Sequence, residues 1–309
     1  MSELETPSSP AAVFGRARAP TVNVPGRGVV IGLRWSGVEG AGNQIVAAKV
    51  ECDPERLRLV RLWRPFTDAP GRRDVLVRFG EWLAEEARWA EGRLVVGVDF
   101  ALSLAETHLR QLGLLRQAIR GPAVLGKHLF ERFVGSAGDF TEGAARFRAE
   151  LGSDRPRATD CYRAELHTPG SARSHRQTLF GLCTLSHVKA AVPPWDPPEP
   201  GKPTLVEVRP AHVARVLCGV CALRDDPRDG GTRSSTRAAV LRTLRSAARL
   251  EFEMEQAAQI VEDAHGDHLD AVLAAAGAAA AWEDGFQGVP SNVPRSEGWI
   301  HSVREEPWR

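Results

Sequence analysis

Carboxylates at the ends of apolar runs are the residues of this sequence best suited to metal chemistry. Asp99 closes the apolar run that begins at residue 93, and Glu207 lies near the end of the run at residues 204–208. Asp270 lies near the start of a predicted helix. Mg²⁺ prefers oxygen ligands of this kind, and two-metal sites with ions about 3.5–4 Å apart promote attack by water on phosphodiesters. The sequence therefore predicts catalytic and Mg²⁺- or Mn²⁺-binding roles for Asp99, Glu207 and Asp270.

Each of these carboxylates also has an ordinary structural explanation. An aspartate at the end of a strand caps a following helix at least as often as it binds a metal. Near the start of a helix, Asp267 and Asp270 would complement the positive end of the helix dipole, which is worth roughly 0.3–1 kcal/mol each. From the residues alone, the metal site and the structural roles are both open.

The helix predicted at residues 265–276 sets where the Asp270 carboxylate can lie. At roughly 100° per residue, Leu269, Val272 and Leu273 fall within one arc of about 100°, which should be buried. Asp270 lies about 60° beyond the edge of that arc by the same spacing, and Asp267 lies further round towards water. We therefore expect Asp270 at the rim of the core.

The order of the other predicted elements indicates the fold class. Apolar or alternating runs at residues 28–33, 44–51 and 57–63 predict three strands joined by short turns, which make an antiparallel meander. A helix at residues 74–90 leads into a strand at 93–100, which is therefore parallel to the first strand. Further predicted elements are a helix at 104–119, a strand at 204–208 and a helical region at 236–264. We expect an α/β fold, a mixed sheet flanked by helices, with ligands beyond the carboxyl ends of its parallel strands.

The chain divides into a folded domain and two flanking segments. Residues 1–27 are rich in Pro, Ser, Ala and Arg without periodicity, which predicts a disordered arm. Residues 28–300 are expected to form a single domain, followed by a tail at 301–309. Within the domain, residues 121–200 are predicted as an irregular insertion with one helix near 177–191.

Composition narrows the classes of protein and partner. A net charge of +1 over 309 residues argues against a strongly basic tail that binds nucleic acid. No apolar run reaches the roughly 18 residues of a membrane span, and no secretory signal precedes the domain, so a cytoplasmic protein without a membrane partner is expected. Five cysteines favour reduced thiols over a disulfide framework. The Cys218-Gly-Val-Cys221 motif is compatible with zinc or redox chemistry, but two buried thiols in an apolar helix explain it better.

Five short segments resemble a known bacterial family when they are taken together and in order. They are IGLRWSG at 31–37, VGVDF at 96–100, VEVRPA at 206–211, HLDA at 268–271 and EGWI at 297–300. This series resembles the proteins grouped as domain of unknown function 429, predicted nucleases with a ribonuclease-H-like fold. The resemblance implies a ribonuclease-H-like sheet over roughly residues 28–300. It also implies an acidic metal site at Asp99, Glu207 and Asp270, with Asp267 as a further ligand.

One residue departs from the pattern of that family. Where relatives generally carry an aspartate in the first strand, this chain has Arg34. Arginine cannot be deprotonated, so it would put a permanent cation where a Mg²⁺ ion should lie and would pair with Asp99 or Asp270. A guanidinium can also hold a phosphate through two parallel hydrogen bonds. We therefore predict substrate-binding roles for Arg34 and for Ser36 of the same segment.

These observations lead to two hypotheses from different classes. The first is a metal-dependent nuclease or phosphodiesterase of ribonuclease-H-like type, a hydrolase that uses Mg²⁺ or Mn²⁺. The second is a non-catalytic module of the same fold, which binds nucleic acid or a protein partner, including a second copy of itself. A hydrolase or transferase acting on a small phosphorylated metabolite fits the same carboxylates, because a fold does not fix its substrate. Trp35, Trp195 and Trp299 could stack on bases, although single tryptophans are more often packing residues.

Overall fold

The structure is a computed structural model that describes residues 27–135, 139–152, 155–162, 172–220, 222–225 and 231–303. The predicted N-terminal arm, apart from residue 27, lies outside these residues. So do Cys221 and the part of the predicted tail that begins at residue 304.

One mixed sheet organises the described residues. Its seven strands run in the order β6-β3-β2-β1-β4-β5-β7. β1 and β3 are antiparallel to β2, while β4 is parallel to β1, β5 to β4 and β7 to β5. The strands are β1 (Gly28–Arg34), β2 (Val46–Cys52), β3 (Leu57–Trp63), β4 (Leu94–Val98), β5 (Thr204–Val208), β6 (Leu250–Glu251) and β7 (Ile300–His301). The prediction of an α/β fold with an antiparallel meander and parallel strands, of ribonuclease-H-like arrangement, is confirmed.

Burial explains why the strands differ in sequence. β4 and β5 lie inside the sheet and every residue in them is buried. β4 is accordingly a continuous run without polar side chains, and β5 is apolar except for Thr204 and Glu207. β3 lies nearer the edge and begins with alternating buried and exposed residues. The sequence patterns of these strands therefore report their positions in the sheet.

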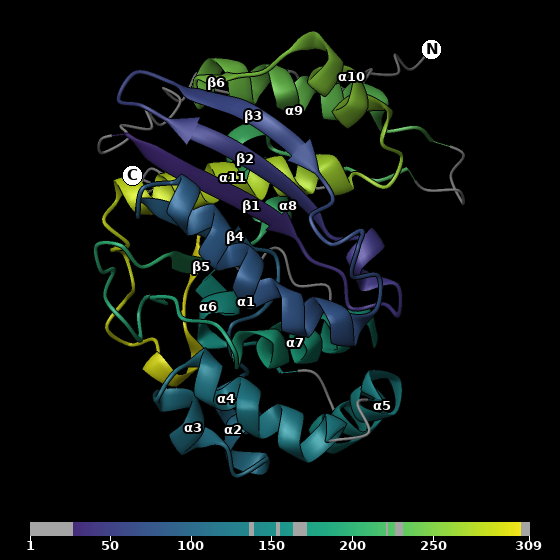
Figure 1. Ribbon diagram of the computed structural model, residues 1–309, viewed down its shortest axis with the longest axis vertical. Coiled ribbons are helices and arrows are strands. Elements are labelled where there is room, and N and C mark those ends of the chain that lie inside the picture. Colours follow the sequence, from purple (N-terminus) through teal and green to yellow (C-terminus); the bar gives the residue numbers. More distant parts are fainter. Residues whose placement is uncertain are drawn as a thin grey trace, which may run out of the picture.

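Helices cover both faces of the sheet (Figure 1). α1 and α7 lie on one face, with α2 to α5 beyond α7, and α8 to α11 lie on the other face. The α-helices are α1 (Arg72–Trp89), α2 (Glu106–Gln111), α3 (Leu115–Ile119), α4 (Pro122–Leu129), α5 (Phe140–Leu151), α6 (Ala158–Tyr162), α7 (Ala172–Leu185), α8 (Pro210–Cys218), α9 (Ser234–Ala247), α10 (Met254–Glu262) and α11 (Asp267–Glu283). Three shorter helical turns are η1 (Ala41–Asn43), η2 (Phe130–Val134) and η4 (Arg295–Glu297).

The alanine-rich helix α11 lies almost directly on the sheet. Residues 268–281 are all buried, as expected of a helix that is apolar all round. A Cβ atom added at Gly32 would lie 2.0 Å from the carbonyl oxygen of Ala271, and one added at Gly97 would lie 2.5 Å from that of Ala274. Because Gly32 and Gly97 are register partners on β1 and β4, they form one flat patch that admits the helix backbone.

Strand alternation decides which side chains reach that helix. Successive strand residues point to opposite faces. Ile31 and Leu33 belong to the cluster with α1 and α7, while Val30 belongs to the cluster with α11. Gly32 and Arg34 therefore share the α11 face of β1, which directs Arg34 towards the start of α11.

Three predictions of local structure were wrong. The region at 121–200, expected to be irregular apart from one helix near 177–191, contains the helices α4, α5, α6 and α7, of which α7 overlaps the predicted helix. Buried aromatic residues such as Phe147 and Phe180 fix two of these helices to the core. The helix expected at 104–119 is divided into α2 and α3 at Gly113, which has a positive φ of 70°. The helical region at 236–264 is divided by β6, which follows Arg249 at φ 51°.

Candidate functional site

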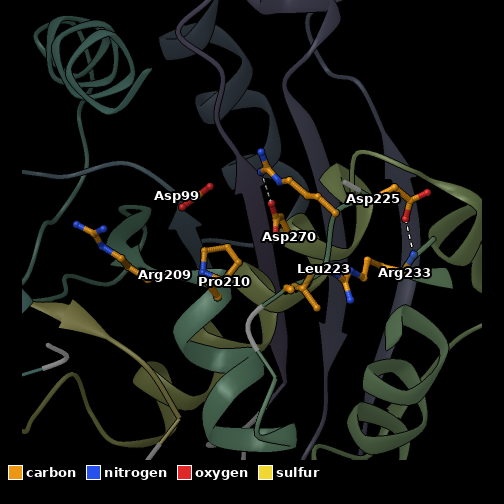
Figure 2. Close-up of a pocket in the computed structure, with 10 residues that line it drawn as sticks. Asp99, Arg209, Pro210, Leu223, Asp225, Arg233 and Asp270 are labelled. Atoms are coloured by element: carbon orange, nitrogen blue, oxygen red, sulfur yellow. Dashed lines mark hydrogen bonds and ion pairs between the residues drawn. The ribbon is translucent and has the colours of Figure 1, made fainter. Parts of the chain in front are cut away.

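A polar pocket lies beyond the carboxyl ends of β4 and β5 (Figure 2). It has a volume of about 500 Å³. Its lining combines three carboxylates with three guanidinium groups, from Asp99, Asp225, Asp270, Arg209, Arg224 and Arg233. Charges of both signs therefore line the pocket, together with apolar residues such as Pro210 and Leu223.

Asp99 contributes a half-buried carboxylate that no described residue engages in a hydrogen bond or ion pair. It directly follows β4, and its backbone N–H continues the ladder by donating to the carbonyl oxygen of Leu33 at 3.0 Å. Burial, and next the negative charge of Asp270, raise the pKa of Asp99 from 3.8 to about 7. The nearby arginines only partly offset these effects. Asp99 and Asp270 thus form a pair of mutually repelling carboxylates.

Asp270 lies in the first turn of α11, where the sequence analysis placed it, but it is buried rather than at the rim, with 7% of its surface exposed. Burial raises the pKa of Asp270, and the charge of Arg224 opposes that effect. An η-nitrogen of Arg224 donates to Oδ2 of Asp270 at 2.8 Å. Arg224 is therefore the direct partner of this carboxylate.

Arg34 pairs with Asp267 instead of the predicted partners, Asp99 and Asp270. Nε of Arg34 lies 2.8 Å from Oδ1 of Asp267, and the two side chains are 3% and 15% exposed. An η-nitrogen of Arg34 also donates to the carbonyl oxygen of Trp35 at 2.8 Å. The reason is geometric: Arg34 reaches the first residue of α11, one turn before Asp270. The charge of Arg34 still lowers the pKa of Asp99 in part.

Glu207 lies at the end of β5 but not with the other predicted ligands. Leu205 belongs to the cluster of α1 and α7, whereas Val206 and Val208 belong to that of α11. Strand alternation therefore directs Glu207 to the face opposite α11. There its Oε2 accepts from the backbone N–H of Leu102 at 2.9 Å.

The Glu207 carboxylate is enclosed by a buried network of charges. Both of its oxygens accept hydrogen bonds from Arg157, one of them at 2.8 Å. Arg157 also binds Asp160, and Arg209 donates to Asp160 at 2.9 Å. Burial alone would raise the pKa of Asp160, but Arg157 and Arg209 outweigh it and hold the pKa well below its usual value. Every charge in this network is compensated within the protein.

Ser36 and the tryptophans are integrated into the core. Ser36 is buried beyond the end of β1 and is not part of the pocket lining. Trp35 stacks on Phe180 with ring centroids 5.3 Å apart. The indole N–H of Trp195 donates to a backbone carbonyl at 2.7 Å, and Trp299 is buried. The tryptophans therefore serve as packing residues, and the predicted substrate contact of Ser36 stays a prediction.

The sequence analysis missed the arginines of the pocket. Arg209 could have been found, because it follows Glu207 by two residues at the end of a predicted strand. Arg224 and Arg233 lie on segments between helices, and no sequence pattern links them to Asp270. Arg157 likewise carries no signal, since its pairing depends on a contact with Glu207 fifty residues away.

The donor set fits one divalent cation better than two. In the described part of the chain, no cluster of three or more His, Cys, Asp or Glu side chains is arranged to hold a metal ion. Mg²⁺, however, is commonly held by one or two carboxylates, with water and substrate phosphates as its other ligands. Asp99 and Asp270 satisfy that requirement, because they supply two carboxylates to one pocket. A cation between them would offset the burial and the negative charge of Asp270 that together raise the pKa of Asp99. Asp267 is already neutralised by Arg34.

Comparison with known proteins adds one match. A family model described as "Protein of unknown function (DUF429)" matches residues 37–295. No curated protein and no solved structure matches this chain. Among the residues that the structure describes, none of the helices has both the length and the apolar character needed to cross a membrane.

Proposed function

The chain belongs to the DUF429 family of proteins of unknown function, and we propose that its pocket hydrolyses phosphate esters with the help of a single Mg²⁺ or Mn²⁺ ion. The observation that carries this proposal is that the carboxylates of Asp99, directly after the parallel strand β4, and Asp270, in the first turn of α11, line the same pocket. Compared with the sequence hypothesis, the proposal keeps metal-dependent phosphoester hydrolysis and reduces the ligand set to these two residues.

The cation would be held between Asp99 and Asp270. Asp99 is suited to this role because none of the described residues engages its carboxylate directly, and Asp270 because it is fixed on a buried helix. A divalent ion bound there supplies Lewis-acid polarisation of a phosphoryl oxygen. Burial strengthens the attraction between the carboxylates and the ion, because charges are less screened there than in water.

The arginines of the pocket would bind the phosphate group. Arg209, Arg224 and Arg233 all line the cavity that Asp99 and Asp270 share. Guanidinium groups bind phosphate through short, charge-assisted hydrogen bonds, often two at a time. Arg34 would add a fixed positive charge beside Asp267, where a second metal ion would otherwise be needed. The chain's own residues thus supply part of the positive charge that the reaction requires.

The size of the cavity favours a compact substrate. A volume of about 500 Å³ lies within the range of roughly 300–1,000 Å³ that is usual for small-molecule sites. A phosphate ester of about nucleotide size would fill such a cavity. The substrate class is therefore a nucleotide-sized phosphate ester, or the terminal nucleotide of a nucleic acid.

Hydrolysis assays with divalent ions test this proposal. Purified protein would be incubated with p-nitrophenyl phosphate, bis-p-nitrophenyl phosphate, single-stranded DNA and RNA, with Mg²⁺, Mn²⁺ or EDTA. We expect metal-dependent release of product in at least one assay, with a loss of at least about 100-fold in Asp99→Asn and Asp270→Asn, as for removal of a group that acts in the transition state. Asp68→Asn, on the exposed segment before α1, is the matched control. Equal activity in all variants, or activity in EDTA, would refute the proposal.

A non-catalytic module is the second candidate, and the arginines favour it. Arg34 and Arg224 already pair with Asp267 and Asp270, so this set of charges is stable without any ion. In that case the pocket would bind the phosphate of a nucleic acid or of a protein partner and leave it intact. Binding of single-stranded nucleic acid that is unaffected by EDTA, with no turnover, would support this candidate.

A further inference from the structure

Arg224 is the pocket residue in contact with both carboxylates of the first turn of α11. An η-nitrogen of Arg224 lies 2.8 Å from Oδ2 of Asp270 and 3.8 Å from Oδ1 of Asp267. Its side chain is 41% exposed, whereas that of Asp270 is 10% exposed. The pair therefore joins a solvent-accessible arginine to a carboxylate that is largely shielded from water.

We propose that Arg224 competes with the divalent cation for Asp270, and that a phosphate-bearing ligand removes this competition. Without ligand, Arg224 neutralises Asp270 and the site binds a cation weakly. When a phosphate group enters, its oxygens attract the guanidinium, and Asp270 becomes available to the cation. This inference rests on the proposed function, since it concerns the same pair of carboxylates.

The backbone around Arg224 is fixed, so the exchange requires only its side chain to turn. The carbonyl oxygen of Leu223 accepts from Arg237 at 3.0 Å. The backbone N–H of Asp225 donates to the carbonyl oxygen of Ala264 at 3.0 Å, and its carboxylate binds Arg237 at 2.8 Å. Arg224 is thus a long side chain on an anchored backbone, directed into the pocket.

Two other arginines near the acidic pair are not suited to this exchange. Arg34 is 3% exposed and is held by Asp267 and by the carbonyl oxygen of Trp35. Arg209 also lines the pocket, but it is held by Asp160 and not by Asp270. Arg224 combines direct contact with Asp270 and access to solvent.

Competition of this kind makes the two ligands cooperative. If phosphate removes a cation's competitor, then phosphate strengthens cation binding, and by linkage the cation strengthens phosphate binding by the same factor. The two ligands would therefore bind in a preferred order, because the pocket binds divalent cations weakly until a phosphate group is present. The exchange would keep divalent ions out of the site until a substrate is present.

Binding of Mn²⁺, measured as free Mn²⁺ by electron paramagnetic resonance, tests the inference without any turnover. Methylphosphonate serves as the phosphate probe, because it carries the same oxygens and cannot be hydrolysed by the proposed reaction. Mn²⁺ would be titrated into wild type, Arg224→Met, Arg224→Lys and Arg233→Met, with and without saturating methylphosphonate. Arg242→Met, on the exposed side of α9, is the control for loss of a charge elsewhere, and circular dichroism checks the fold of each variant.

In wild type we expect methylphosphonate to lower the Kd of Mn²⁺ by a factor within the usual allosteric range of about 5–150. Arg224→Met should bind Mn²⁺ more tightly than wild type without methylphosphonate, and the effect of methylphosphonate should be reduced. Arg224→Lys should lie between the two. Arg242→Met should keep the wild-type ratio of the Mn²⁺ Kd without methylphosphonate to that with it. Arg233→Met removes a proposed phosphate contact but not the partner of Asp270, so it should keep the wild-type Kd of Mn²⁺ in the absence of methylphosphonate.

The failure of this inference differs from failure of the proposed function. Suppose that wild type binds Mn²⁺ and Asp99→Asn does not, but that Arg224→Met has the wild-type affinity for Mn²⁺ and the wild-type response to methylphosphonate. Arg224 then does not compete with the cation, and only the inference is overturned. The same conclusion follows if Arg233→Met raises the affinity as much as Arg224→Met does. If Mn²⁺ binds none of these proteins, with or without methylphosphonate, both the inference and the proposed cation site are overturned.

Discussion

The guanidinium of Arg34 lies 2.8 Å from the carboxylate of Asp267, at the point where the first strand of the sheet meets the start of α11. Arg34 is nearly inaccessible to solvent, and strand alternation directs it to the same face of the sheet as α11. The pair neutralises Asp267 with a buried arginine. Asp270, by contrast, is paired with the solvent-accessible Arg224, and the Asp99 carboxylate in the same pocket has no direct partner among the described residues. This difference is the reason to propose one cation in place of two.

Substitution of Arg34 tests that difference. Arg34→Asp removes the fixed positive charge and adds a carboxylate beside Asp267, so we expect the number of bound Mn²⁺ ions to rise from about one to about two per chain. Isothermal titration with Mn²⁺ and methylphosphonate measures the number of ions. Arg34→Met removes the charge without adding a ligand, so this variant should still bind about one Mn²⁺ ion per chain. A folded Arg34→Asp variant that still binds one ion would contradict the account.

The pH dependence of stability offers an independent test of the carboxylate pair. The pKa of Asp99 is about 7 in the folded state, against a usual value of 3.8. Between these values the folded state binds more protons than the unfolded state, so the free energy of unfolding decreases as the pH rises from about 4 to about 7. The free energy of unfolding of wild type minus that of Asp99→Asn should therefore decrease from about pH 4 to about pH 7 and change little above that.

Urea denaturation of both proteins at several pH values between about 5 and 8 measures this difference. Addition of Mn²⁺ should restore wild-type stability at the upper end of the range, because a ligand that binds only the folded state stabilises it. A difference that does not change with pH would show that the carboxyl of Asp99 is not held in its neutral form.

The close contact between α11 and the sheet predicts a strong effect of a small substitution. Gly32→Ala would place a Cβ atom 2.0 Å from the carbonyl oxygen of Ala271, so helix and strand must separate. We expect a loss of at least about 1–3 kcal/mol in the free energy of unfolding. Gly40→Ala is the matched control, because its Cβ would have no neighbour within 4 Å and its φ of −82° suits alanine. Equal stability of the two variants would show that the helix is less tightly packed.

The buried network around Glu207 predicts a second stability effect. Arg157→Met would leave Glu207 and Asp160 without their main partner, and removal of one partner from a buried ion pair usually costs about 3–5 kcal/mol. Urea denaturation should show such a loss, with part of it recovered when Glu207→Gln is added to the variant. Arg155→Met, at an exposed position, should be neutral. A neutral Arg157→Met would contradict the structural role assigned to this network.

The strand patterns made most of the sheet predictable. Residues 57–63 and 204–208 were assigned the bounds that the structure has. Alternation indicates a strand at 57–63, and at 204–208 the short length and the flanking prolines favour a strand over a helix. Of the helices at 121–200, α7 overlaps the one helix predicted there, near 177–191, whereas α4, α5 and α6 were not predicted. The break at Arg249 was missed because a positive φ at a non-glycine residue leaves no mark in the sequence.

The candidate site was predictable only in part. Asp99 follows from the rule that ligands gather beyond the ends of parallel strands, and Asp270 was predicted because it starts a helix that could pack beside those ends. Glu207 also lies at the end of a parallel strand. That position, however, does not determine on which face of the sheet its side chain lies. Alternation separates Glu207 from Val206 and Val208, but the structure was needed to show that α11 covers the face of Val206 and Val208. Arg224 required the structure, because a contact across 46 residues depends on the whole fold.

A cation titration of wild type and Asp99→Asn is the most direct test of the central claim, that Asp99 and Asp270 form a site for one divalent ion. Mn²⁺ would be titrated in the presence of saturating methylphosphonate, so that Arg224 does not limit binding. The account predicts about one Mn²⁺ per wild-type chain, competed by Mg²⁺, and a loss of affinity of at least about tenfold, or 1.4 kcal/mol, in Asp99→Asn. Equal binding by the two proteins, or binding by neither, would contradict it.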